Sequence, residues 1–151
     1  MGTVVANASL SLDGYVAKAD NSIGRLFDWY EAGDVEVTTG TSGLTFHLTP
    51  ASAADWREWT AGLGAIVYGR TLFDLVDGWG GRHTMDAPVV VVTHRLPTEW
   101  VRNHPDAPFE FVTTGVSAAP IEDVPLGDTD VCIPSARVTH LRMPVLRPDP
   151  S

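Results

Sequence analysis

The sequence predicts a single α/β domain with a mainly parallel sheet, and three apolar runs carry that prediction. Val89–Val92 is an unbroken valine run, which is typical of a strand buried on both faces of a parallel sheet. Ala65–Tyr68 stops at Gly69 and passes directly into a helical pattern, so we expect a strand that feeds a helix. Val4–Leu10 has small and β-branched side chains and predicts a third central strand beside the other two.

Composition limits the function classes. The 151 residues suit one domain, over 1–146, followed by a flexible tail at 147–151. A net charge of −9 argues against a nucleic-acid partner, and no apolar run is long enough for a membrane span. There is no signal-peptide pattern, and the one cysteine, Cys132, cannot form an internal disulfide. We therefore expect a cytoplasmic protein, and no Cys/His spacing predicts a metal site.

In the first part of the chain, the Asp13–Gly14 pair breaks the first strand, and a surface turn and a ligand-binding loop are both open interpretations. The aromatic cluster Leu26–Tyr30 is expected in the core or in a pocket wall. Alternation from Gly33 to Pro50 predicts a hairpin whose tip, 38–45, is either an exposed flap or a cover over a pocket.

A helical pattern follows the hairpin. Ser52 with Asp55 has the spacing of a helix cap, and Ala53 and Trp56 fall on one face with Gly62 near the end. In this pattern, Trp56 is expected to pack in the core.

The strand–glycine–helix joint at Gly69 is the first candidate ligand site. Thr71 and Asp74 have capping-box spacing, and Gly78 ends the pattern. Free backbone N–H groups with Arg70 beside them would suit a phosphate. Joints of this kind that bind nothing are common in α/β proteins, so both interpretations stay open.

The second candidate site is Thr93–Arg95, which follows the valine strand. Open α/β sheets bind ligands at the carboxyl ends of their strands, and an arginine can hold a phosphate bidentately; a solvated strand end is the alternative. Phe109–Val112 predicts another strand. Prolines interrupt the rest, where Val131–Ile133 and Val138–Met143 are possible strands.

Three segments together resemble the dihydrofolate reductase-like superfamily: Asn7–Ala17, Ile66–Phe73 and Pro88–Arg95. The branch they resemble is the reductase domain of bacterial bifunctional riboflavin deaminase-reductases. The resemblance implies a three-layer α/β/α fold, NADPH as cofactor, and hydride transfer to a small heterocyclic or carbonyl substrate. It also implies a homodimer. An atypical C-terminal part would leave apolar sheet surface open to water, and this surface would favour dimerisation.

The resemblance also assigns site residues by position. Ala8 and Ser9 would lie near the nicotinamide, and Asp13 and Gly14 would lie on the substrate side. The remaining residues would hold cofactor phosphates: Gly69, Arg70 and Thr71 the shared ones, and Thr93, His94 and Arg95 the 2′-phosphate that favours NADPH. No general acid is identifiable, and folate reduction is not expected because the acidic residue that engages the pterin has no counterpart.

The C-terminal part departs from the family. Pro134–Arg137 stands where a glycine-rich turn would grip the pyrophosphate. Two hypotheses follow: an NADPH-dependent reductase related to the pyrimidine reductase of riboflavin biosynthesis, or a non-catalytic member of the fold that binds a small ligand or dimerises.

Overall fold

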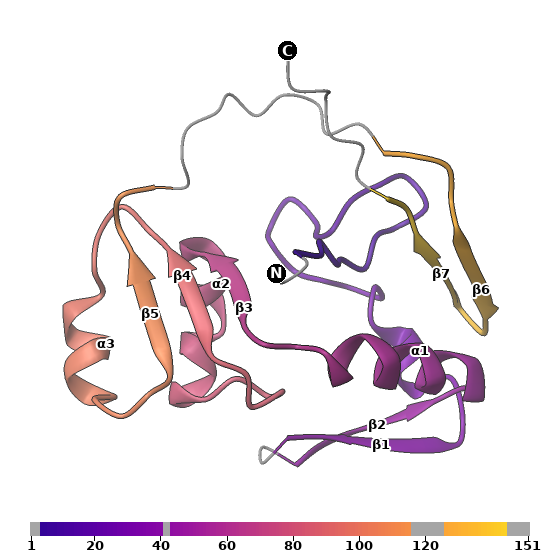
Figure 1. The fold of residues 1–151 in the computed structure, drawn as a ribbon, viewed down its shortest axis with the longest axis horizontal. Coiled ribbons are helices and arrows are strands. Elements are labelled where there is room, and N and C mark those ends of the chain that lie inside the picture. Colours follow the sequence, from indigo (N-terminus) through magenta and orange to yellow (C-terminus); the bar gives the residue numbers. More distant parts are fainter. Residues whose placement is uncertain (1–3, 41–42, 116–125, 145–151) are drawn as a thin grey trace.

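The computed structural model describes residues 4–40, 43–115 and 126–144 and has a mixed α/β architecture (Figure 1). Its strands form one parallel sheet of order β3-β4-β5 and two antiparallel hairpins, β1-β2 and β6-β7. The α/β class is confirmed. Parallel pairing is confined to the three-stranded sheet, because the other two sheets are antiparallel. The expected tail at 147–151 lies outside the described residues.

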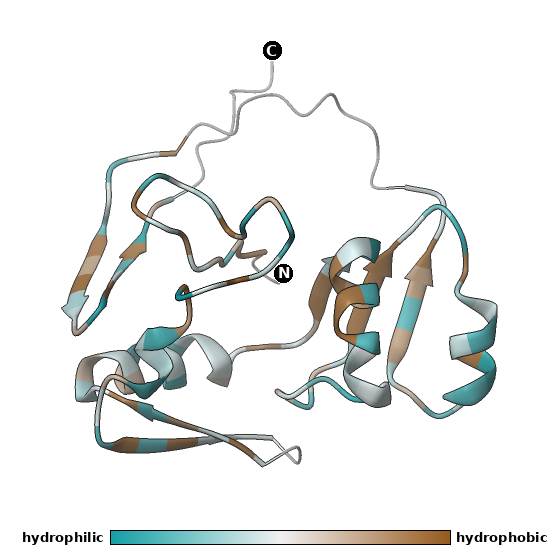
Figure 2. Ribbon diagram, turned by 180° about the vertical axis from the view of Figure 1, so that it is seen from behind, coloured by the Kyte–Doolittle hydropathy of each residue, from teal (hydrophilic) through white to brown (hydrophobic). Residues whose placement is uncertain are grey.

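The parallel sheet is built from β3 (Ile66–Gly69), β4 (Val89–Val92) and β5 (Phe109–Val112). Val89 and Val91 of β4 are 1% and 0% exposed, as the valine run predicts. Figure 2 shows that hydrophobic residues predominate in these strands. The helices α2 (Arg70–Leu75) and α3 (Thr98–Asn103) complete this part, where Phe73 and Trp100 pack in a T-shaped contact.

One strand prediction is wrong and another is wrong in part. The segment Val4–Leu10 is not a strand, and Val4 is 95% exposed. Its small side chains bury little apolar area, so strand propensity alone does not fix it against a neighbour. The run at Ala65–Tyr68 does form β3 beside β4, but β3 is an edge strand among the described residues, and Val67 is 61% exposed.

A second core lies under helix α1 (Pro50–Ala61), where the predicted hairpin is confirmed as β1 (Val35–Thr39) and β2 (Leu44–Leu48). Aromatic residues from three elements take part in this core, and one of these elements is the short 3₁₀ helix η1 (Asp28–Glu31). The buried members of the core are Trp29, Val37, Phe46, Leu48, Ala53 and Trp56. The core roles expected for the aromatic cluster and for Trp56 are therefore confirmed. Part of the hairpin tip, 41–42, lies outside the described residues.

Both predicted helix caps are wrong. Helix α1 starts at Pro50, so Thr49 is the N-cap and its side chain accepts from the Ser52 backbone N–H at 3.2 Å. Helix α2 starts at Arg70 with Gly69 as N-cap and no side-chain cap. Thr71 is therefore already inside the helix, two positions after the N-cap.

Helix α2 ends at Leu75, before the predicted stop at Gly78. The 3₁₀ segment η2 (Asp77–Gly81) follows it in left-handed backbone, with φ of +54° at Gly78 and +50° at Trp79. Positive φ at a tryptophan is strained, and packing holds it: the Trp79 ring lies 5.2 Å from that of Tyr68.

The C-terminal strands are confirmed as a hairpin of β6 (Val131–Ser135) and β7 (Val138–Arg142), which lies beside α1 (Figure 1). The segment that stands in place of the family's glycine turn makes the tip of this hairpin, with φ of +66° at Arg137. It is thus part of an antiparallel pair and packs against α1.

Candidate functional site

The carboxyl ends of β3 and β4 bring Arg70, Thr93 and Arg95 together. Arg70 Nη1 donates to the Arg95 carbonyl at 2.8 Å and to Thr93 Oγ1 at 3.4 Å. The buried Thr93 hydroxyl also donates to the Arg95 carbonyl at 2.9 Å and accepts from the Arg95 N–H at 3.3 Å. These bonds fix the path of the chain as it leaves β4, so three residues predicted to share a site do lie together.

The polar atoms at this edge divide into two groups. Arg70 is held by the bonds above and by Asp74, which accepts from its Nε at 2.7 Å. In contrast, the side chains of His94 and Arg95 are exposed and make no hydrogen bond or ion pair with the rest of the described chain. Arg70 and Thr93 therefore shape the turn, while His94 and Arg95 can meet a ligand.

The start of α2 leaves room beside these cations. A Cβ at Gly69 would meet no atom within 4 Å, and Thr71 is exposed. An anionic group could approach the backbone there, with Arg95 in the turn that follows the neighbouring strand β4. The residues at this edge fit a nucleotide phosphate in charge and in access.

The N-terminal candidates lie in a separate arrangement. Asp13 accepts a hydrogen bond from Ser11 Oγ, and Ser11 also bonds with the backbone of Tyr15 around Gly14, whose φ is +86°. Ala8 is exposed in the preceding coil, and Ser9 is half-buried there. In the described residues, no hydrogen bond or ion pair joins these four candidates, Ala8, Ser9, Asp13 and Gly14, to the strand ends.

A buried network that the sequence did not indicate ties β6 and β7 to α1. Ser52 Oγ lies 2.9 Å from His140 Nε2, and Asp55 Oδ2 lies 3.5 Å from His140 Nδ1. This order of groups is that of a catalytic triad. However, Ser52 is 1% exposed and its hydroxyl donates to Ser135 Oγ at 2.8 Å, so no substrate reaches it. The network therefore holds the hairpin on the helix.

Arg142 extends this network towards the surface. It donates to Asp55 at 2.7 Å and to Glu58 at 2.6 Å. The hydrogen bond from Arg142 lowers the pKa of Glu58, and the two carboxylates raise the pKa of Arg142. No spacing rule could have found these pairs, because 84 to 88 residues separate the partners.

A second pair that sequence reasoning missed joins β3 to the loop before β4. His83 Nδ1 accepts from the Met85 N–H at 3.2 Å, so its Nε2 carries the proton and donates to the Tyr68 hydroxyl oxygen at 3.0 Å. Burial lowers the pKa of His83 and raises that of Tyr68, which keeps both groups neutral.

Metal and membrane sites are not found in the described ranges. No cluster of three or more His, Cys, Asp or Glu side chains is placed to hold a metal ion. None of the described helices combines the length and the apolar character needed to cross a membrane.

The chain has no match among protein-family models, and none is found among curated proteins or solved structures. The dihydrofolate reductase-like resemblance therefore stays a prediction from the three sequence segments.

Proposed function

We propose that the chain is an NADPH-dependent reductase of a small heterocyclic or carbonyl compound, related to the pyrimidine reductase of riboflavin biosynthesis. One observation carries the proposal: two adjacent parallel strands end in a fixed polar turn that leaves His94 and Arg95 facing solvent. Carboxyl ends of parallel strands are where α/β sheets hold nucleotides. A cytoplasmic location, where the exposed Cys132 stays reduced, belongs to the same proposal.

The contacts of the strand-end residues suggest a separate role in cofactor binding for each of them. Arg95 and His94 pair with the 2′-phosphate of NADPH, and the backbone at Gly69 and Thr71 receives the phosphates shared with NADH. Arg70 and Thr93 position Arg95 by holding its carbonyl. The cofactor, when bound, supplies the hydride.

The substrate side of the proposal depends on the family resemblance alone. It assigns Ala8 and Ser9 to the nicotinamide and Asp13 and Gly14 to the substrate. The three-layer, dihydrofolate reductase-like arrangement is likewise proposed. The parallel β3-β4-β5 sheet supports it, and the β6-β7 hairpin is its atypical C-terminal part.

A homodimer is part of the proposal because apolar surface stays open around β3. Val67 on this edge strand is 61% exposed, and Leu75 of α2 is 58% exposed. A second copy that covers this surface would remove it from water. Light scattering at micromolar concentration should give twice the chain mass, and replacing Val67 by Lys should shift the protein to monomer.

A second candidate function has its own observation. The segment 134–137 forms the end of β6 and the β6-β7 turn beside α1. It therefore does not supply the backbone N–H donors that bind a pyrophosphate in the dihydrofolate reductase-like family. A non-catalytic member that binds a small ligand or dimerises would have this feature.

Titration of the protein into NADPH, followed by cofactor fluorescence, separates the two candidates. The reductase proposal predicts saturable binding that Arg70→Ala weakens for NADPH and NADH alike, because Arg70 begins α2 beside the phosphates that the two cofactors share. Arg102→Ala, which removes an exposed arginine of α3, is the matched control and should bind as the parent does. No change in cofactor fluorescence at NADPH concentrations up to millimolar would support the non-catalytic alternative.

A further inference from the structure

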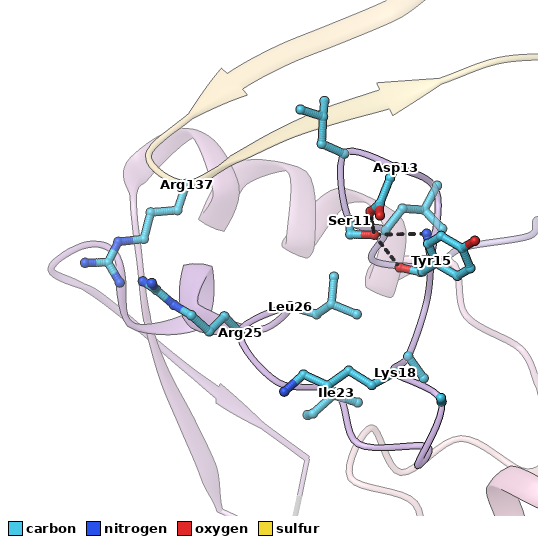
Figure 3. Close-up of a pocket in the computed structure, with 12 residues that line it drawn as sticks. Ser11, Asp13, Tyr15, Lys18, Ile23, Arg25, Leu26 and Arg137 are labelled. Carbon is cyan, nitrogen blue, oxygen red and sulfur yellow. Dashed lines mark hydrogen bonds between the residues drawn. The ribbon is translucent and has the colours of Figure 1, made fainter.

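A hollow of about 630 Å³ lies between the N-terminal segment and the tip of the β6-β7 hairpin (Figure 3). This volume is within the range of small-molecule sites, which is about 300–1,000 Å³. The N-terminal segment supplies most of its wall between Leu10 and Leu26, and Arg137 reaches it from the hairpin turn. It contains none of the strand-end residues assigned to the cofactor.

Three of the ten basic residues in an acidic chain gather at this hollow: Lys18, Arg25 and Arg137. Figure 3 shows their charged ends on one side and the Ser11–Asp13–Tyr15 turn on the other. Lys18 is the chain's only lysine, and its side chain runs across Gly24, where a Cβ would lie 2.8 Å from its Cε.

Two carboxylates face these three cations. Asp28 accepts from Arg25 at 2.7 Å and lies 4.0 Å from Arg137 Nη1, which keeps the two guanidinium groups near each other. Asp13 lies across the hollow, where it accepts from Ser11 Oγ. Counting Asp13 and Asp28 against the three cations leaves one positive charge, although the whole chain carries a net charge of −9.

The rest of the wall is apolar and open to water. Leu10 is 59% exposed, Leu12 fully exposed and Ile23 47% exposed, and Ala17, Ala19 and Leu26 also line the hollow. An occupant with an apolar body would cover these side chains, and their burial would add to the attraction of one charge.

We propose that this hollow binds a small monoanion with an apolar ring or chain, such as an aryl or alkyl carboxylate. The anionic group lies among Lys18, Arg25 and Arg137, and the apolar body lies against the leucine and isoleucine side chains. The hollow shares Asp13 with the substrate side of the proposed function, but the three cations and the apolar wall that carry this proposal are assigned no role there.

Equilibrium dialysis of the full chain without NADPH tests the site with naphthaleneacetate and its neutral amide. The carboxylate should bind severalfold more tightly than the amide, and salt should reduce the difference because the cations are exposed. Lys18→Gln and Arg137→Gln should each weaken carboxylate binding about two- to fivefold and leave the amide unchanged. Arg102→Gln removes the same charge elsewhere and should change neither ligand.

Nuclear magnetic resonance places the ligand, because the single lysine gives one ammonium-bearing side-chain signal. That signal should shift with naphthaleneacetate and not with the amide. Equal affinities for the two ligands would overturn the proposal. Binding of neither ligand, or an equal loss in Arg102→Gln and Arg137→Gln, would also overturn it.

Discussion

Replacing Asp55 by Asn should loosen the β6-β7 hairpin from α1. Asp55 is 9% exposed, accepts from Arg142 at 2.7 Å and lies 3.5 Å from His140 Nδ1. Asparagine keeps the shape of the side chain but removes its charge and places an amide N–H₂ where an oxygen accepted. Breaking a fully buried charge pair costs about 3–5 kcal/mol. Since the Arg142 side chain is 37% exposed, we expect a smaller loss, about 2 kcal/mol.

Glu58→Gln is the matched control because Glu58 binds the same guanidinium at 2.6 Å, while its side chain is 66% exposed. Water replaces an exposed partner at little cost, so this variant should unfold as the parent does. Urea unfolding followed by tryptophan fluorescence measures both, and amide hydrogen exchange should place the Asp55→Asn loss in β6 and β7. Equal changes in the two variants, or an Asp55→Asn loss below about 0.5 kcal/mol, would refute a buried network that holds the hairpin.

Three further predictions concern backbone strain and ionisation. Gly78→Ala places a Cβ 2.5 Å from the Trp100 ring at a φ of +54°, whereas the Cβ of Gly80→Ala, at a φ of +64°, meets no atom within 4 Å. Thermal unfolding should show that Gly80→Ala loses about 1–2 kcal/mol of stability and that Gly78→Ala loses clearly more. Equal losses of stability in the two variants would contradict the packing around Gly78. Burial lowers the pKa of His83 below 6.5, so the unfolded chain takes up the proton first and stability should fall as the pH drops below about 6.5, a slope that His83→Gln should reduce. Burial raises the pKa of Tyr30 from 10.0 to about 12, so stability should be lost as the pH rises between these values, and a Tyr30→Phe variant with the same alkaline profile would count against this.

Local sequence patterns predicted the strands whose burial is regular. The valines of β4 are enclosed by β3 and β5, and the alternation around Phe46 matches a hairpin with one buried face. Both patterns can be recognised from consecutive residues alone. Residues 4–10 show the limit of this reasoning, because strand propensity does not specify a partner and the segment is exposed coil.

The helix starts were mispredicted for a different reason. Ser52 and Asp55 have cap spacing, but Pro50 suits the first helical position, and this makes Thr49 the cap. Both residues are then free to turn inward and meet His140. The place of Thr93–Arg95 at a strand end was predicted because the segment directly follows a recognisable strand. The bond between Arg70 and the Arg95 carbonyl needed the three-dimensional fold.

The relative affinity for NADPH and NADH tests the central claim most directly. Arg95 and His94 should favour NADPH, because a charge-assisted bond to the extra phosphate contributes about 1.5–3 kcal/mol, or about tenfold to a hundredfold in affinity. Arg95→Ala should remove most of this preference and leave NADH binding nearly unchanged. Equal affinities of the parent protein for the two cofactors, or a preference that survives in Arg95→Ala, would contradict the assignment of the β4 end to the 2′-phosphate.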